Sequence, residues 1–220
     1  FINIKQVGSK TVTEILKNFW VIEGLDGSGT TTQTKALEKF LLSRHFSVLV
    51  TSEPSDGLIG QLIRESCLKD KIITDQRTLL SLYTADRYDH IFSAHGIISM
   101  LDKYDFVISD RYFFSSFAYQ SVSVDFEEVL RQNRDFPYPE IVFYIDTPVE
   151  DCVKRISHRG NECELFEKKD FLLSAYANYQ KALNLKFPSK SHCFAINGML
   201  PVDEVSNQIF KHISEVYGIK

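Results

Sequence analysis

A glycine-rich segment near the N-terminus contains the residues best suited to chemistry. It reads Gly24-Leu25-Asp26-Gly27-Ser28-Gly29-Thr30-Thr31-Thr32 and lies between an apolar run, 19–22, and a stretch with helical periodicity, 31–43. A glycine-rich turn between a strand and a helix can bind phosphate, because its N–H groups point inward and the helix N-terminus adds partial positive charge. We therefore predict that this segment binds a nucleotide; the alternative is a glycine-rich turn without a ligand.

One position departs from the phosphate-loop pattern G-x-x-x-x-G-K-[ST]. The glycines are Gly24 and Gly29 and the final hydroxyl is Thr31, but Thr30 occupies the lysine position. Threonine is too short and uncharged to replace the charged hydrogen bond to the phosphates, a loss of about 1.5–3 kcal/mol. This corresponds to roughly one to two decades in rate or affinity. The sequence thus predicts an intact backbone cradle and a possible reduction in activity.

Two further polar clusters follow apolar runs that are typical of strands. Ser52-Glu53-Pro54 comes after the run 47–50, and Asp110-Arg111-Tyr112 comes after the run 106–109. Ligands of parallel α/β sheets bind outside the carboxyl ends of the strands, so we expect these clusters and the glycine-rich segment to form one site. An aspartate at such a strand end can hold magnesium or its water shell, and we assign this role to Asp110. The alternative is a surface pair of Asp110 and Arg111 in a loop.

Side chains with helical spacing suit recognition of a planar base. Tyr83 and Arg87 are four residues apart, so a helix would place a stacking ring and a guanidinium on one face. Ser116 and Gln120 have the same spacing and would direct a hydroxyl and an amide to one place. The alternatives are a core tyrosine beside a surface arginine, and a polar helix face.

A charged segment near 156–168, which contains a glycine, separates two predicted helices. Arg155 precedes it and Arg159 lies within it. Closure of such a lid would bring an arginine to a transferring phosphoryl group and exclude water. Arg155 could also supply part of the charge that Thr30 lacks. The alternative is a solvated connection between helices.

Alternating strands and helices must position these residues. We predict strands at 19–22, 47–50, 106–109, 141–145 and 193–196, and helices at 31–43, 58–68, 75–101, 114–120, 149–157, 167–183 and 202–217. Such alternation favours an α/β fold of the P-loop NTPase type, with three layers (α/β/α) and a five-stranded parallel sheet. Residues 18–220 would form a single P-loop domain after an N-terminal extension, 1–17, in which 11–16 could be a short helix.

Composition narrows the class of protein. The chain has 220 residues and a formal net charge of −4, which argues against nucleic-acid binding driven by bulk charge. The four cysteines lie far apart without a C-x-x-C motif, so reduced thiols in a cytoplasmic protein fit best. Because no apolar run approaches about 20 residues, no membrane span is expected.

Together these motifs resemble the thymidylate kinase family, whose members phosphorylate dTMP with ATP. The motifs that carry the resemblance are 19–33, Ser52-Glu53-Pro54, the segment 83–87, and Asp110-Arg111-Tyr112 continuing to Tyr119-Gln120. The resemblance covers residues 18 to the C-terminus. It implies the P-loop kinase fold, Mg²⁺ with ATP as the phosphoryl donor, dTMP as the acceptor, and a homodimer formed through helices that flank the sheet.

The resemblance also implies roles for particular residues. The catalytic residues would be Arg159, Asp26 and Arg111. Residues 24–32 and Arg155 would bind ATP. The dTMP site would consist of Asp26, Glu53, Pro54, Tyr83, Arg87, Arg111, Ser115, Ser116, Tyr119, Gln120 and Phe166. Thr31, Asp26 and Asp110 would hold the metal. Tyr83 would stack on thymine, where the family usually has phenylalanine.

The function predicted from the sequence is therefore transfer of the ATP γ-phosphoryl group to dTMP. One rival is a nucleotide-binding protein without catalysis. A second rival is a deoxynucleoside kinase, for which Glu53 could act as the base near a 5′-hydroxyl.

Overall fold

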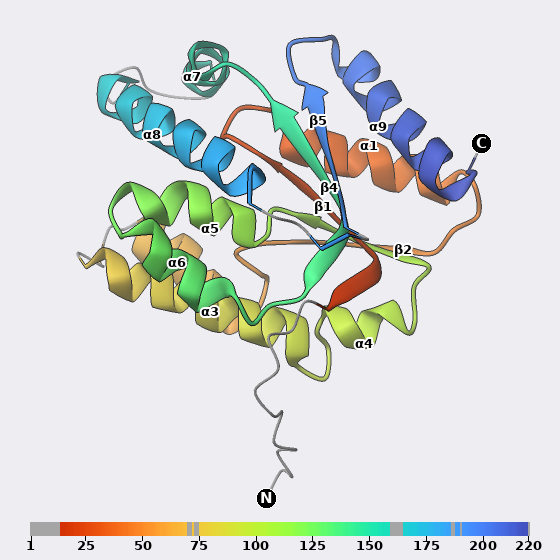
Figure 1. Ribbon diagram of the computed structural model, residues 1–220, viewed down its shortest axis with the longest axis horizontal. Helices are drawn as coiled ribbons and strands as arrows, with labels where there is room; N and C mark the ends of the chain where they lie inside the picture. Colours follow the sequence, from red (N-terminus) through yellow and green to blue (C-terminus); the bar gives the residue numbers. More distant parts are fainter. Residues whose placement is uncertain are drawn as a thin grey trace, which may run out of the picture.

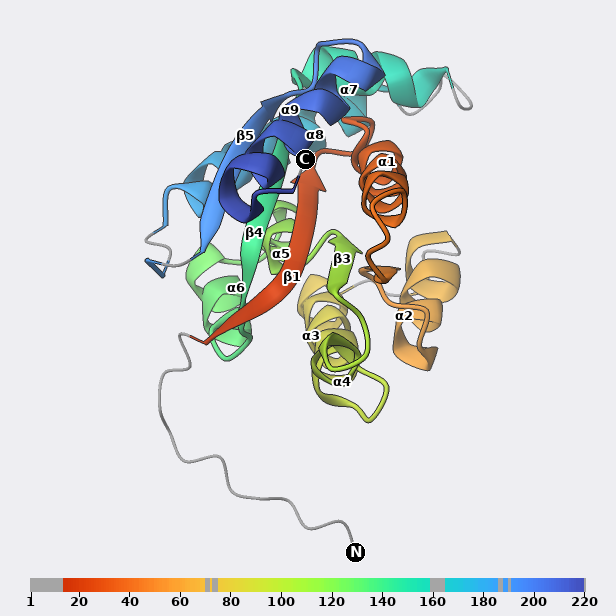
Figure 2. The same ribbon diagram turned by 90° about the vertical axis from the view of Figure 1, so that its right-hand side faces the viewer.

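A five-stranded parallel sheet forms the centre of the protein, which agrees with the predicted fold class (Figure 1). The computed structural model describes residues 14–69, 72, 75–158, 165–185, 188–189 and 191–219. The strands are β1 (Ile15–Gly24), β2 (Val48–Ser52), β3 (Phe106–Asp110), β4 (Tyr138–Asp146) and β5 (His192–Asn197). They lie in the order β2-β3-β1-β4-β5, and Figure 2 shows β5, β4, β1 and β3 side by side.

Helices cover both faces of this sheet. One face carries α1 (Thr30–Leu42) and α9 (Val202–Tyr217). The other face carries α3 (Gln76–Phe92), α4 (Ile97–Leu101), α5 (Phe113–Tyr119), α6 (Phe126–Asn133), α7 (Val149–Ser157) and α8 (Leu165–Leu183). The short α2 (Leu58–Leu62) packs against α3. No helix in the described part of the chain is long and apolar enough to cross a membrane.

The central strand β1 is buried on both sides, because its side chains alternate between the two layers. Phe19 and Val21 belong to the core beneath α3, α5 and α8, whereas Trp20 and Ile22 belong to the core beneath α1 and α9. All four side chains are completely buried. A short apolar run thus becomes the central strand of a three-layer fold.

The strand register brings the predicted polar clusters to one edge of the sheet. Ile22 of β1 lies opposite Asp110 of β3, and Ser52 of β2 lies opposite the same Asp110. The three segments that follow these residues therefore emerge side by side, as expected from the sequence.

The N-terminal part of the sheet begins earlier than predicted. Ile15 and Leu16 pair with Tyr138 and Pro139 of β4, so they are strand residues rather than the end of a helix. Residues 15–17, which we assigned to the extension, are thus part of the sheet. The main-chain pairing with β4 and the contact of Leu16 with the core explain the extended conformation.

Two helical predictions also need correction, and one helix was not predicted. The predicted helix 75–101 is divided, because the backbone is extended at Ser93, after α3, and at Gly96, before α4. The predicted helix 58–68 consists of α2 and a π-helical turn, Ile63–Lys69. Helix α6 was not predicted, although Asp125 caps it by accepting the N–H groups of Glu127 and Glu128.

Candidate active site

The glycine-rich segment forms a tight loop between β1 and α1. Gly27 and Gly29 have φ angles of 86° and 106°, a left-handed conformation that glycine adopts without a steric penalty. A Cβ atom on Gly27 would lie 2.6 Å from the Cys152 oxygen, so α7 also requires glycine here. The loop borders a hollow of about 330 Å³, which we call the loop hollow. Its lining residues are Asp26, Gly27, Gly29, Thr30, Thr31, Thr32, Arg111 and Ile156.

The end of β3 places a carboxylate beside the first turn of α1. Thr31 Oγ1 donates to Asp110 Oδ2 at 2.5 Å. The other oxygen, Asp110 Oδ1, is buried and has no hydrogen-bond partner among the described residues. Oxygen donors of this kind suit Mg²⁺, which usually binds one or two protein oxygens together with phosphates and water. The geometry at Thr31 and Asp110 therefore fits the predicted metal.

A second cavity, of about 310 Å³, lies on the other side of Asp26 and Arg111. We call it the deep cavity. Its lining residues are Asp26, Glu53, Pro54, Gln76, Leu79, Tyr83, Arg87, Arg111, Tyr112, Ser115, Ser116, Tyr119, Gln120 and Phe171. The fold thus gathers every residue predicted for the dTMP site except Phe166, whose side chain lies outside the described structure. On the same helix, α8, Phe171 lines the deep cavity and contacts the ring of Tyr119.

Arg111 lines both spaces and is held in an unusual conformation. Its φ angle is 75°, which is rare for a residue with a side chain and occurs mainly where the surroundings enforce it. Its N–H donates to the Ile22 oxygen at 2.9 Å, and its own oxygen accepts Ser109 Oγ at 2.7 Å. The guanidinium pairs with Asp26 Oδ1 at 2.7 Å and donates to the Gly24 oxygen at 2.7 Å. The main chain and the side chain are therefore both positioned before any ligand binds.

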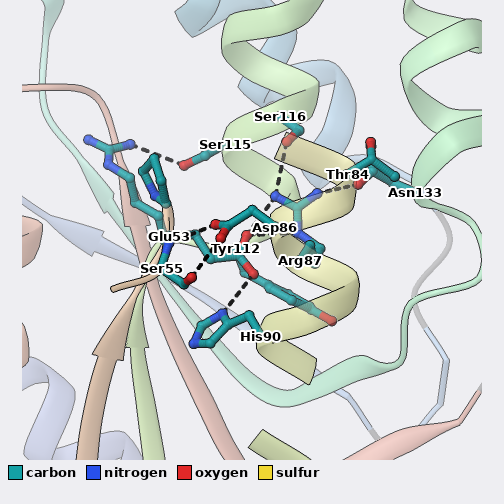
Figure 3. Close-up of polar contacts among 12 residues, drawn as sticks. Glu53, Ser55, Thr84, Asp86, Arg87, His90, Tyr112, Ser115, Ser116 and Asn133 are labelled. Carbon is teal, nitrogen blue, oxygen red and sulfur yellow. Dashed lines mark hydrogen bonds and ion pairs between the residues drawn. The ribbon is translucent and has the colours of Figure 1, made fainter. Parts of the chain in front are cut away.

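Arg87 is more enclosed than the helix pattern suggested. Only 1% of the residue is exposed, and the guanidinium lies 2.6 Å from Glu53 Oε2. It also donates to Asn133 Oδ1 and, at 3.0 Å, to Ser116 Oγ (Figure 3). The interpretation as a surface arginine is wrong. Arg87 is a buried cation at the back of the deep cavity, and its partners leave only part of the guanidinium for a ligand.

Arg155 lies away from the position that a loop lysine would occupy. Its guanidinium donates to the oxygens of Ser28 at 3.2 Å and Gly198 at 2.9 Å. It lines a separate pocket of about 270 Å³ between the loop, α7 and α9, and is not among the residues lining the loop hollow. The hypothesis that Arg155 compensates for Thr30 is therefore not favoured. Arg159, the predicted lid arginine, lies outside the described residues.

Sequence comparisons agree with this geometry. The thymidylate kinase family model matches residues 22–209. The chain belongs to the thymidylate kinase family. It is 37% identical over 212 residues to the "Putative thymidylate kinase" of Treponema pallidum, covering 94% of this chain and 99% of that protein. It is 35% identical over 196 residues to the "Probable thymidylate kinase" of Pyrococcus abyssi, covering 87% and 93% of the two chains. It is also 37% identical over 200 residues to the "Probable thymidylate kinase" of Methanocaldococcus jannaschii, covering 90% of this chain and 96% of that protein.

Membership in the thymidylate kinase family confirms the recognised resemblance, the phosphotransferase class and the type of fold. Several residues around this kinase site were not predicted. Glu23 and Tyr179 contact each other behind Arg111, Asn133 holds Arg87, and Arg64 donates to the Pro54 oxygen at 2.5 Å. These contacts join residues from different elements, so no local spacing could indicate them.

Removing the negative charge of Glu53 should strongly destabilise the fold. Burial raises the pKa of Glu53, but Arg87 and His90 outweigh this effect and hold it below the ordinary value. Glu53→Gln would leave Arg87 buried without its counter-ion, which costs about 3–5 kcal/mol. Urea unfolding at pH 7 would measure the loss. Asp56→Asn is the control, because the Asp56 side chain is 98% exposed and its pair with Arg64 should contribute less than about 1 kcal/mol. Equal stability of Glu53→Gln and wild type would contradict the expectation.

Glu23 should make the protein less stable as the pH rises towards neutrality. Burial raises its pKa to about 7, despite the opposing effects of Arg111, Ser115 and Tyr179. The folded protein then binds the proton more tightly than the unfolded chain. The stabilisation is complete below about pH 4.5 and is lost as the pH rises to about 7. Between pH 5 and 7.5, wild type should lose about 2 kcal/mol more than Glu23→Gln in urea unfolding. Parallel pH profiles of the two proteins would refute this.

Proposed function

We propose that the protein transfers the γ-phosphoryl group of ATP to dTMP, giving dTDP and ADP. The observation that carries this proposal is that Asp26 and Arg111 line both the loop hollow and the deep cavity. A nucleotide in each space would therefore have its phosphates beside the same arginine. This end-to-end arrangement suits direct transfer between two nucleotides.

The deep cavity has the composition expected for a pyrimidine deoxynucleotide. Pro54, Leu79 and Tyr83 offer apolar surface for the base and sugar, while Ser116 and Gln120 offer polar atoms. Burial raises the pKa of Tyr83 to about 12, so this ring remains a neutral stacking partner at physiological pH. Arg111 would bind the acceptor phosphate. The sides of the cavity thus divide into base-binding and phosphate-binding parts.

The loop hollow would hold the phosphates of ATP. The backbone of residues 24–32 and the N-terminus of α1 supply N–H groups and partial positive charge. Thr31 and Asp110 would hold Mg²⁺, which neutralises phosphate charge when bound. Asp26, the third residue predicted to hold the metal, lines the same space and is paired with Arg111. Arg155 would contact the donor nucleotide from the far side of the loop.

The mechanism requires no strong general base. The acceptor phosphate is already ionised, so catalysis consists of positioning the two nucleotides and neutralising their charge. Arg111 orients the acceptor oxygen, and the loop N–H groups fix the donor phosphates. By the resemblance to the family, Arg159 would neutralise the charge that develops on the transferring phosphoryl group.

An assay of ADP release with a panel of monophosphates tests the proposed function. Purified protein with Mg²⁺ and ATP should turn over dTMP, and dUMP more weakly, because both fit the same cavity. UMP, dCMP and AMP should give rates close to background. Equal turnover of UMP or AMP would assign the chain to another substrate. Binding of dTMP in calorimetry without any turnover would favour the rival, a nucleotide-binding protein without catalysis.

Restoring the loop lysine should increase activity. Thr30 lies beside Thr31 in the loop hollow, where a lysine side chain would reach the donor phosphates. We expect Thr30→Lys to raise kcat by about tenfold or more, since a charged hydrogen bond contributes about 1.5–3 kcal/mol. Thr78→Lys, on α3 away from the loop, should leave the rate unchanged. If Thr30→Lys has wild-type kcat, another group already supplies the missing charge.

The deoxynucleoside kinase alternative is not favoured by the environment of Glu53. Its carboxylate is paired with Arg87 and lies 3.2 Å from His90 Nδ1, and its pKa is lowered. A carboxylate held in this way is a weak base for a 5′-hydroxyl. Thymidine should therefore not replace dTMP in the ADP-release assay.

We further propose that the protein is a cytoplasmic homodimer that does not bind nucleic acid. Exposed apolar residues on α2 and α3 support pairing through helices beside the sheet: Leu58, Leu62, Tyr88 and Phe92. The net charge of −4 is compatible with a protein that does not bind nucleic acid. The free thiols of Cys67, Cys152 and Cys193 are compatible with a cytoplasmic location. Light scattering after gel filtration would test the dimer.

A further inference from the structure

Behind Arg111 lies a buried hydroxyl that the proposed mechanism does not yet use. Tyr179 is on α8 and is completely buried. Its hydroxyl lies 2.8 Å from Glu23 Oε2, 2.9 Å from Ser115 Oγ and 3.3 Å from Arg111 Nη1. These partners come from β1, from α5 and from the turn after β3, so the hydroxyl links α8 to three other parts of the site.

The donors and acceptors around Glu23 determine the direction of these hydrogen bonds. Glu23 Oε1 accepts the N–H groups of Tyr112 at 2.8 Å and Ser115 at 3.3 Å. Glu23 Oε2 accepts the hydroxyls of Ser115 at 2.7 Å and Tyr179 at 2.8 Å. Since the Tyr179 hydroxyl donates to Glu23, its lone pairs are available to accept from Arg111. Tyr179 therefore connects the Glu23 carboxyl group to the guanidinium.

The two sides of the Arg111 guanidinium differ in their surroundings. Towards the protein interior, Nη1 donates to the Gly24 oxygen, to Ser115 Oγ and to the Tyr179 hydroxyl. Towards the ligand spaces, Nη2 pairs with Asp26, whose side chain is 61% exposed. A bound phosphate would compete with the Asp26 carboxylate for Nη2, while the interior contacts would remain. The interior contacts are thus the ones able to hold Arg111 in place during transfer.

We infer that Tyr179, supported by Glu23, is a positioning residue that fixes Arg111 for the acceptor phosphate. This inference rests on the proposed function. Tyr179 is not among the residues that line the deep cavity or the loop hollow, so it acts through the orientation of the guanidinium and not by direct contact with a nucleotide. A positioned arginine makes its full electrostatic contribution at the moment of transfer, because no reorganisation is then needed.

The substitution Tyr179→Phe removes the hydroxyl and keeps the ring. We expect kcat/KM for dTMP to fall about tenfold to a hundredfold, the value of one hydrogen bond to a charged group. The KM for ATP should change less than about twofold. Tyr176→Phe is the matched control, because this tyrosine lies one turn earlier on α8 and its hydroxyl donates to Asp146 at 3.3 Å, away from Arg111. It should retain wild-type kinetics.

A double-mutant cycle separates positioning from a general structural role. In the Arg111→Ala background, Tyr179→Phe should cause no further loss of residual turnover or of dTMP affinity in calorimetry. The same loss in both backgrounds, or an equal rise in the KM for ATP, would overturn the inference. If Tyr179→Phe does not fold, Glu23→Gln takes its place in the same cycle, with the same expected outcome. Wild type without dTMP-dependent ADP release would instead overturn the proposed function.

Discussion

Arg111→Ala should lower kcat/KM for dTMP by about 10³-fold while the protein remains folded. Arginines that neutralise charge in phosphoryl transfer contribute about 10³–10⁵ in rate, and we expect the lower end because Arg159, the proposed lid arginine, would still be present. Arg111 lines both nucleotide spaces, and four polar partners hold its guanidinium. Steady-state kinetics with dTMP varied at saturating ATP would measure the loss.

Arg134→Ala is the control for this experiment. Arg134 follows α6, its side chain is 63% exposed, and its pair with Asp135 lies outside the candidate site. It should retain wild-type kinetics. A loss below tenfold for Arg111→Ala would contradict the account, because no other cation of the described residues lines both spaces. A parallel loss in the control would point to a general effect of surface charge.

Asp110→Asn should lower kcat by about 10²-fold and raise the Mg²⁺ concentration needed for half-maximal rate. Asp110 Oδ2 accepts the Thr31 hydroxyl, and Oδ1 is buried without a partner among the described residues. An uncharged amide would bind a hydrated cation less well, and changes to groups that hold or orient a metal typically cost 10–100-fold. Titrating Mg²⁺ at constant free ATP would separate weaker metal binding from slower transfer.

Asp102→Asn serves as the control for the metal experiment. Asp102 is exposed at the end of α4, at the opposite end of β3, and should leave both parameters unchanged. If Asp110→Asn has the same Mg²⁺ dependence and kcat as wild type, Asp110 does not hold the metal.

The sheet and the edge that carries the site could be predicted from the sequence because their signals are local. Each strand is an apolar run, and polar residues at the strand ends indicate where a ligand binds. The phosphate loop, Glu53-Pro54 and Asp110-Arg111 were identified in this way, and the register of β1, β2 and β3 brings them together. The residues predicted for the dTMP site, apart from Phe166, all line the deep cavity. Their roles in binding stay predictions.

The remaining features depend on contacts between distant residues. Arg87 could not be recognised as buried, because its partners Asn133 and Ser116 are 46 and 29 residues away. The link between Tyr179 and Glu23 spans 156 residues. By contrast, α6 had a local signal that was missed: Asp125 followed three residues later by Glu128 is typical of a helix N-terminus.

We expect one site to hold two nucleotides whose phosphates meet at Arg111, which lines both spaces. The most direct test of this arrangement is calorimetry with a ligand in which adenosine and thymidine are joined through five phosphates. We expect one ligand per chain, an affinity at least about 10²-fold higher than that of ATP or dTMP alone, and competition by both nucleotides. Affinity no higher than that of either nucleotide, or competition by only one of them, would contradict it.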